Sequence, residues 1–146
     1  MTEILIKRLS KNVSLPKYGT DGASGMDLEA NIKKPIDLNP GKTAIIPTGL
    51  AVLIPQNFEI QIRPRSGLAA KNQITVLNTP GTIDSDYRGE IKIILINLGK
   101  KTFTIEKKTR VAQMVLSPII KIKLKEVEDL EKSIRGIGGF GSTGLK

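Results

Sequence analysis

Carboxylates are the side chains of this sequence best suited to proton-transfer chemistry. Its 146 residues include no cysteine and no histidine, which removes thiol nucleophiles, imidazole bases and the usual zinc ligands. A proton-abstracting group must then be Asp, Glu, Tyr or Lys. Asp27 and Asp84 each have apolar neighbours, and partial desolvation would raise the basicity of such a carboxylate. The alternative is that both are turn residues that cap their own backbone.

Arginines are a second group of candidates, as ligands for an anion. The sequence has only 6 arginines against 17 lysines. Five of them lie in or beside clusters of glycine, proline or acidic residues: Arg63, Arg65, Arg88, Arg110 and Arg135. The planar guanidinium group binds phosphate through two parallel hydrogen bonds, which a lysine cannot do. For any one of these arginines, pairing with a nearby carboxylate is the alternative.

The C-terminal segment has a composition of its own. Residues 135–144 read RGIGGFGSTG, and so much glycine costs too much backbone entropy for an ordinary helix or strand. Exposed backbone N–H groups together with Arg135, Ser142 and Thr143 would suit a phosphate chain. The alternative is a disordered terminus.

Short β-strands must position these side chains, because apolar and polar residues alternate along much of the chain. The alternation is regular over 59–63 and 120–125, as in a strand with one face exposed to solvent. Residues 90–97 alternate and then become fully apolar over 93–96, which predicts a strand buried on both faces. Other β-prone runs, with Pro, Gly and Asn between them, lie at 4–6, 43–46, 51–54 and 111–116. Many short strands of this kind predict an all-β sandwich or barrel.

Two stretches are predicted to be helical, and the length indicates one domain. Residues 66–72 form a short candidate helix with Ser66 as its N-cap. Residues 126–134 are acidic and form a longer candidate.

The charge balance favours an anionic partner. The formal net charge is +9, which suits nucleic acid, a phosphate ester or an acidic membrane. Aromatic residues make up only 3%, which disfavours a protein that stacks single-stranded bases on aromatic rings. Because no apolar run reaches the roughly 20 residues of a membrane span, and no apolar signal core follows the N-terminus, we expect a cytoplasmic protein without a membrane partner.

Five segments, in order along the chain, resemble the five motifs of the trimeric dUTP pyrophosphatase (dUTPase) family. They are DGASGMDLEA at 21–30, PRSGLA at 64–69, NTPGTIDSDYRGE at 78–90, RVAQMV at 110–115 and RGIGGFGSTG at 135–144. One such segment could arise by chance, but five in family order are highly specific. No position that the family uses for chemistry departs from its pattern.

The resemblance implies an all-β, jelly-roll-like sandwich or barrel with one short helix over residues 1–134, and a flexible glycine-rich lid over 135–146. It implies a homotrimer with active sites at subunit boundaries and no stable nucleic-acid partner. It also implies hydrolysis of dUTP to dUMP and pyrophosphate, assisted by Mg²⁺, which keeps uracil out of DNA and supplies dUMP for thymidylate synthesis.

The same resemblance implies a role for individual residues. Asp84 would orient and deprotonate the attacking water, and Asp27 would support the catalytic network and the hydrated Mg²⁺, which has no direct protein ligand. Tyr87 would pack on the deoxyribose and leave no room for a 2′-hydroxyl. The phosphates would contact Arg65, Ser66, Gly67 and Gln113. Uracil would be held by the Asn78 side chain and the backbone of Gly81, Thr82 and Ile83. In the lid, Arg135, Ser142 and Thr143 would bind the γ-phosphate end, Phe140 would lie over uracil, and Gly141 would also contact the substrate.

Other functions remain as alternatives. A dCTP deaminase has a similar fold and substrate, but Ile94 stands where that family has its catalytic glutamate, and an isoleucine cannot transfer protons. A basic β-barrel that binds nucleic acid would suit the net charge, although the lysines are spread along the chain rather than clustered. A structural jelly-roll shell protein would have no use for five segments rich in arginine and aspartate.

Overall fold

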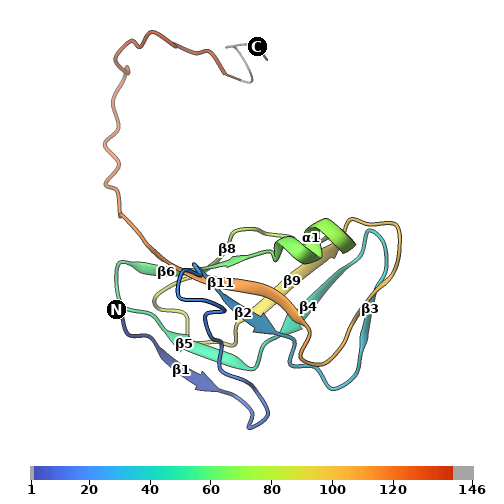
Figure 1. The fold of residues 1–146 in the computed structure, drawn as a ribbon. Coiled ribbons are helices and arrows are strands. Elements are labelled where there is room, and N and C mark those ends of the chain that lie inside the picture. Colours follow the sequence, from blue (N-terminus) through green and yellow to red (C-terminus); the bar gives the residue numbers. More distant parts are fainter. Residues whose placement is uncertain (1, 140–146) are drawn as a thin grey trace.

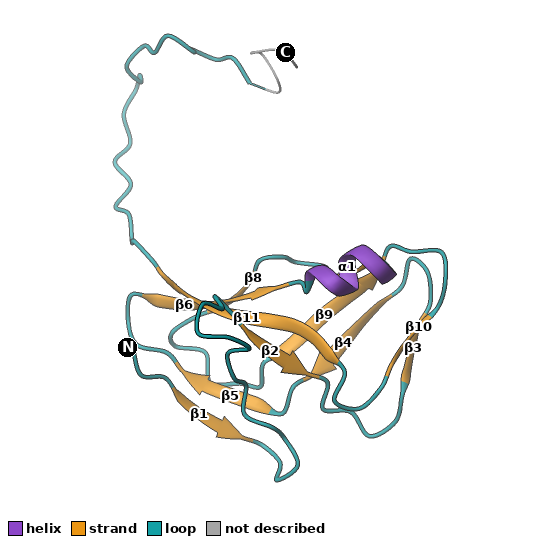
Figure 2. Ribbon diagram, viewed as in Figure 1, coloured by secondary structure: helices purple, strands orange, loops and turns teal. Residues whose placement is uncertain are grey.

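The computed structural model describes residues 2–139, which form short strands and one helix (Figures 1 and 2). In chain order the elements are β1 (Leu5–Arg8), β2 (Met26–Glu29), β3 (Ile36–Leu38), β4 (Thr43–Pro47), β5 (Leu50–Leu53), β6 (Phe58–Arg63), α1 (Ser66–Asn72), β7 (Ile74–Val76), β8 (Gly81–Ile83), β9 (Lys92–Asn97), β10 (Phe103–Ile105) and β11 (Arg110–Pro118). The predicted all-β class is therefore confirmed.

The strands of the described residues pair in antiparallel sheets. One sheet has the order β2-β11-β6-β8 and another the order β4-β9-β7, while β1 with β5 and β3 with β10 form two-stranded ribbons. None of these sheets closes into a barrel. Because β2 pairs with β11, the first and fourth of the five sequence segments lie side by side.

Alternate residues of these strands build one apolar core. On β6, Ile60 and Ile62 are 1% and 3% exposed. On β9, Ile93 and Leu95 are fully buried, but Ile94 between them is only half-buried. The prediction that this strand is buried on both faces is therefore wrong, since only one face belongs to the core.

The predicted helix over 66–72 is confirmed as α1, which follows β6 directly. Its N-cap is Arg65, whose side chain makes no capping hydrogen bond, so Ser66 is the first helical residue and not the predicted cap. Gln73 ends the helix in the left-handed conformation with φ 55°, a common helix stop. No helix in residues 2–139 is long and apolar enough to cross a membrane.

Residues 119–139, here called the C-terminal arm, leave the end of β11 and extend away from the folded body (Figure 1). The arm contains no helix or strand, so the predicted strand over 120–125 and the predicted helix over 126–134 are wrong. Ile120, Ile122 and Leu124 are 92%, 78% and 84% exposed. The alternation gives the segment two faces, but a strand also needs a neighbour for its backbone groups, and none of the described strands pairs with it.

Candidate active site

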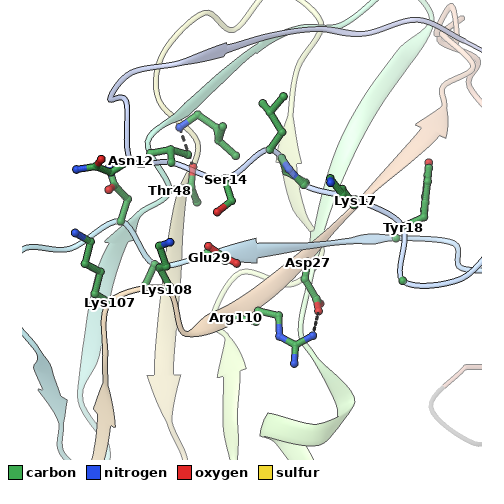
Figure 3. A pocket seen from close by; sticks show the side chains of 18 of the residues that line it. Asn12, Ser14, Lys17, Tyr18, Asp27, Glu29, Thr48, Lys107, Lys108 and Arg110 are labelled. Carbon is green, nitrogen blue, oxygen red and sulfur yellow. Dashed lines mark hydrogen bonds and ion pairs between the residues drawn. The ribbon is translucent and has the colours of Figure 1, made fainter.

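One carboxylate and two guanidinium groups form an ion-pair cluster at one end of the four-stranded sheet. Asp27 on β2 accepts a hydrogen bond from Arg65 Nε at 2.8 Å and another from Arg110 Nη1 at 3.2 Å; the second is drawn in Figure 3. Arg65 Nη1 also donates to the backbone oxygen of Arg110 at 3.2 Å. Asp27 is thus a strand residue that pairs with two arginines. The alternative that it is a turn residue capping its own backbone is wrong.

Strand register brings these residues together. Gln113 of β11 pairs with Asp27 on one side and with Arg63 of β6 on the other. The β11–β2 register shifts between Arg110 and Ala112, as in a β-bulge, which changes the direction of the side chains beside it. With this shift Arg110 reaches the carboxylate of Asp27.

Gln113 links the centre of this sheet to the segment that leads into α1. Its Nε2 donates to the backbone oxygen of Pro64 at 3.0 Å. Its Oε1 lies so close to Gly25 that an ideal Cβ at residue 25 would be only 2.6 Å away. Gly25, in the first of the five segments, therefore leaves space for the Gln113 side chain. The structure therefore brings together the predicted Asp27, Arg65 and Gln113, with Ser66 and Gly67 exposed directly after Arg65.

A cleft of about 670 Å³ opens beside the ion-pair cluster (Figure 3). Besides Asp27 and Arg110, its charged lining residues are Lys17, Lys107, Lys108 and Glu29. Cations outnumber carboxylates in this lining, so the cleft favours an anionic group.

The other predicted residues of the folded body form a second group around β8. The Nδ2 atom of Asn78 would be 3.2 Å from an ideal Cβ at Gly81, so the amide lies against the start of the strand. Gly81, Thr82 and Ile83 form β8 itself, an edge strand of the sheet. Asp84 and Tyr87 follow it and are exposed.

The two groups lie far apart within one chain. The strand β8 ends opposite Ile60 of β6, whereas Asp27 lies in line with Arg63. About four residue rises along the strands and three strand spacings across the sheet separate Asp84 from Asp27, a distance on the order of 20 Å. A single chain therefore does not bring both carboxylates to one phosphate. Nor does a single chain desolvate Asp84, whose side chain is exposed.

The predicted lid residues lie in or beyond the C-terminal arm. Arg135 is exposed, and its Nε donates to the backbone oxygen of Gly138 at 2.8 Å, which is a local contact. Phe140, Gly141, Ser142 and Thr143 lie outside the described residues.

Arg110 is the member of the ion-pair cluster that the predicted site omitted. It opens the RVAQMV segment and is one of the five arginines in a distinctive setting, so the sequence did contain a signal. What the sequence could not indicate is its partner, because Asp27 is 83 residues away along the chain.

Comparison with known sequences identifies the family. The family model described as dUTPase matches residues 11–144. The chain belongs to the dUTPase family. The predicted resemblance is therefore confirmed, and the protein is an enzyme of that family.

Relatives of this chain cover its whole length. The deoxyuridine 5'-triphosphate nucleotidohydrolase of Rickettsia bellii (strain OSU 85-389) is 58% identical over 146 residues, covering 99% of this chain and 97% of the relative. The protein of the same name from Alkaliphilus metalliredigens (strain QYMF) is 56% identical, covering 100% of both chains.

Solved dUTPase structures share the fold. A mutant dUTPase of Staphylococcus bacteriophage 80alpha with dUpNHpp superposes with a TM-score of 0.89 at 28% identity, covering 99% of this chain and 100% of that chain. A second structure of the 80alpha dUTPase with the same compound has a TM-score of 0.85 at 30% identity, with the same coverage. The predicted jelly-roll-like fold is confirmed, in an open form and not as a closed barrel.

Proposed function

We propose that this dUTPase-family enzyme hydrolyses dUTP to dUMP and pyrophosphate by in-line attack of water on the α-phosphate, with Asp84 as general base. The observation that carries the proposal is the ion-pair cluster in which Asp27 holds Arg65 and Arg110 beside a cationic cleft. Phosphoryl transfer depends mainly on positioning and on neutralising charge at the non-bridging oxygens. Two fixed guanidinium groups can do both.

Arg65 is the cation best prepared to bind a phosphate. Its Nε and Nη1 atoms are held by Asp27 and by the Arg110 carbonyl, while its Nη2 makes no hydrogen bond within the described part of the chain. The planar group is thus fixed in orientation before the substrate binds, which reduces the entropy lost on binding. Ser66 and Gly67, together with Gln113, would complete the phosphate contacts.

The edge strand β8 provides the groups for base recognition. One edge of β8 pairs with β6, and no described strand pairs with the other. The free backbone groups of an edge strand present donors and acceptors in a fixed order, which uracil could match with help from Asn78. Cytosine would leave some of these groups unpaired, which discriminates strongly. Thymine differs by one methyl group, so its exclusion would be steric.

Asp84 and Tyr87 lie on the same turn. In this proposal Tyr87 contacts the sugar, and Asp84 lies near the water that attacks the α-phosphate. Tyr87 is 43% exposed, so its ring is available to pack on a deoxyribose. Asp84 is exposed and its carboxylate is available to accept a proton from water. A positioned general base of this kind contributes about 10²–10⁴ in rate.

The ion-pair cluster of one chain and the group around β8 of another would meet across the subunit boundaries of a homotrimer. The distance of about 20 Å between Asp27 and Asp84 within a chain supports a site completed by a second copy. The C-terminal arm supports it as well, because its apolar side chains Ile120, Ile122 and Leu124 are exposed and its backbone has no partner strand within residues 2–139.

Magnesium would enter with the substrate and not in a protein cage. No group of three potential metal ligands occurs among the described residues. Both oxygens of Asp27 already accept hydrogen bonds from arginines, so this carboxylate suits a metal-bound water better than the ion itself. When bound, Mg²⁺ supplies charge neutralisation on the phosphate oxygens.

Residues 135–146 would close over the bound nucleotide as a lid, with residues 1–134 as the β domain. A glycine-rich segment can change conformation at low cost, and closure would exclude water. Arg135, Ser142 and Thr143 would bind the γ-phosphate end, Phe140 would lie over uracil, and Gly141 would also contact the substrate. By removing dUTP, the enzyme would keep uracil out of DNA and supply dUMP for thymidylate synthesis.

One experiment tests the proposed reaction. Pyrophosphate release is measured side by side with dUTP, UTP and each of dATP, dCTP, dGTP and dTTP, and ammonia release is measured with dCTP. We expect rapid pyrophosphate release from dUTP alone. Ammonia from dCTP would indicate a deaminase, and salt-sensitive binding of DNA without pyrophosphate release would indicate a nucleic-acid-binding protein.

A further inference from the structure

The turn that follows β8, residues 84–90, is held by hydrogen bonds within itself. The Tyr87 N–H donates to the Asp84 carbonyl at 3.1 Å, and Arg88 Nη1 donates to the Ser85 carbonyl at 2.7 Å. The Tyr87 hydroxyl donates to the Glu90 carbonyl at 3.0 Å. The ring of Tyr87 therefore folds back over the chain, and its orientation depends on the residues that follow it.

Gly89 provides the space into which this ring folds. An ideal Cβ at residue 89 would lie 2.5 Å from Tyr87 Cζ and 3.0 Å from Cε2, and closer still to the hydroxyl oxygen. No left-handed φ is involved at this glycine, so its role is to leave space and not to permit an unusual backbone conformation. Any side chain at this position would move the ring.

Glu90 fixes the other end of the turn to the folded body. Its Oε1 accepts a hydrogen bond from the Gly49 N–H at 2.8 Å, and residue 49 lies in the tight connection between β4 and β5. The next residue, Ile91, donates its N–H to the Leu50 carbonyl at 2.8 Å. The carbonyl that accepts the hydrogen bond from the Tyr87 hydroxyl thus belongs to Glu90, whose side chain is held by Gly49.

We infer that Gly89 and Glu90 are positioning residues that set the discrimination between deoxyribonucleotides and ribonucleotides, acting through Tyr87. The inference rests on the proposed function, in which the Tyr87 ring packs on the deoxyribose. Exclusion of a 2′-hydroxyl by contact is steric, and a shift of the ring by about 1 Å changes the fit of such a site substantially. The ring has no other hydrogen bond within residues 2–139 to hold it.

The test compares kcat/KM for dUTP and for UTP in Gly89→Ala, Tyr87→Phe, Glu90→Ala and Glu90→Gln, with Glu106→Ala as the matched control. We expect the dUTP/UTP ratio to fall by about tenfold or more in Gly89→Ala and Glu90→Ala, on the scale of a misplaced contact. Tyr87→Phe, which loses only the hydroxyl, should lower the ratio as well. Glu90→Gln keeps an oxygen that can accept the Gly49 N–H, so it should keep the ratio, as should the control, whose glutamate is exposed.

A purely structural role for these residues would lower both kcat/KM values together and leave their ratio unchanged. An unchanged ratio in Gly89→Ala, or an equal fall in Glu90→Ala and Glu90→Gln, would overturn the inference. If Glu90→Ala does not fold, Gly89→Ala and Tyr87→Phe decide the result, because neither removes the contact with Gly49. A wild-type protein that releases no pyrophosphate from dUTP would instead overturn the proposed function, and the inference with it.

Discussion

Replacing Arg65 with alanine separates the proposed catalytic role of the ion-pair cluster from its contribution to stability. The change removes the contacts to Asp27 and to the Arg110 carbonyl, but it leaves the strand register, which depends on backbone pairing. The Arg65 and Asp27 side chains are 27% and 33% exposed, and solvent screening at such exposure limits a salt bridge to about 1 kcal/mol or less. The Tm should therefore fall by only about 2–4 °C.

The expected loss of activity is much larger. Under the proposed mechanism Arg65 Nη2 donates to a phosphate oxygen, and loss of one such donor to a transition state lowers kcat by about 10²–10³, or about 3–4 kcal/mol. Arg65→Lys keeps the charge without the planar fork, so its loss should be intermediate. Pyrophosphate release over a range of dUTP concentrations gives kcat and kcat/KM, and thermal unfolding of the same preparations gives the Tm.

Arg8→Ala is the matched control, because Arg8 is an exposed arginine on β1 with no salt bridge in the described residues. It should leave kcat/KM unchanged. If Arg65→Ala stayed within about threefold of wild type in kcat/KM, Arg65 would not bind the phosphates and the proposed orientation of the substrate would be wrong.

Three further predictions concern other parts of the chain. Asp84→Asn should lower kcat by about 10²–10⁴ or more, while a non-cleavable dUTP analogue should still bind by calorimetry; near-normal turnover would rule out Asp84 as the base. Deletion of residues 135–146 should leave the number of chains in the assembly unchanged and abolish most turnover, whereas unchanged steady-state kinetics would contradict the lid. Gly49→Ala should lower the free energy of unfolding by about 1–3 kcal/mol, because Gly49 has φ +70° and an ideal Cβ would be 2.5 Å from a neighbouring asparagine; an unchanged urea midpoint would contradict this.

The parts of the fold that depend on local pattern could be predicted from the sequence. The alternation over 59–63 predicted β6, and the β-prone run at 43–46 with turn residues on either side predicted β4. The alternation over 120–125 is equally regular but forms no strand, because pairing requires a second edge that the pattern cannot supply. A regular apolar pattern therefore predicts a strand only where a partner is available.

In the candidate site too, the residue types could be predicted from the sequence but their contacts could not. The sequence indicated Asp27 and Arg65 as separate residues, but their contact depends on the pairing of β2 with β11 and on the approach of the segment after β6. The bulge that directs Arg110 to Asp27 involves no special residue type that could be recognised in advance. Long-range register, which the sequence does not encode locally, decides which side chains meet.

The separation of Asp84 from Asp27, which holds Arg65, has a genetic consequence. Under the proposed trimer, a chain disabled at Arg65 and a chain disabled at Asp84 carry complementary defects, so hybrids formed from the two inactive proteins would contain some boundaries with both residues intact. Co-expression of two null alleles would then restore part of the phenotype that neither restores alone.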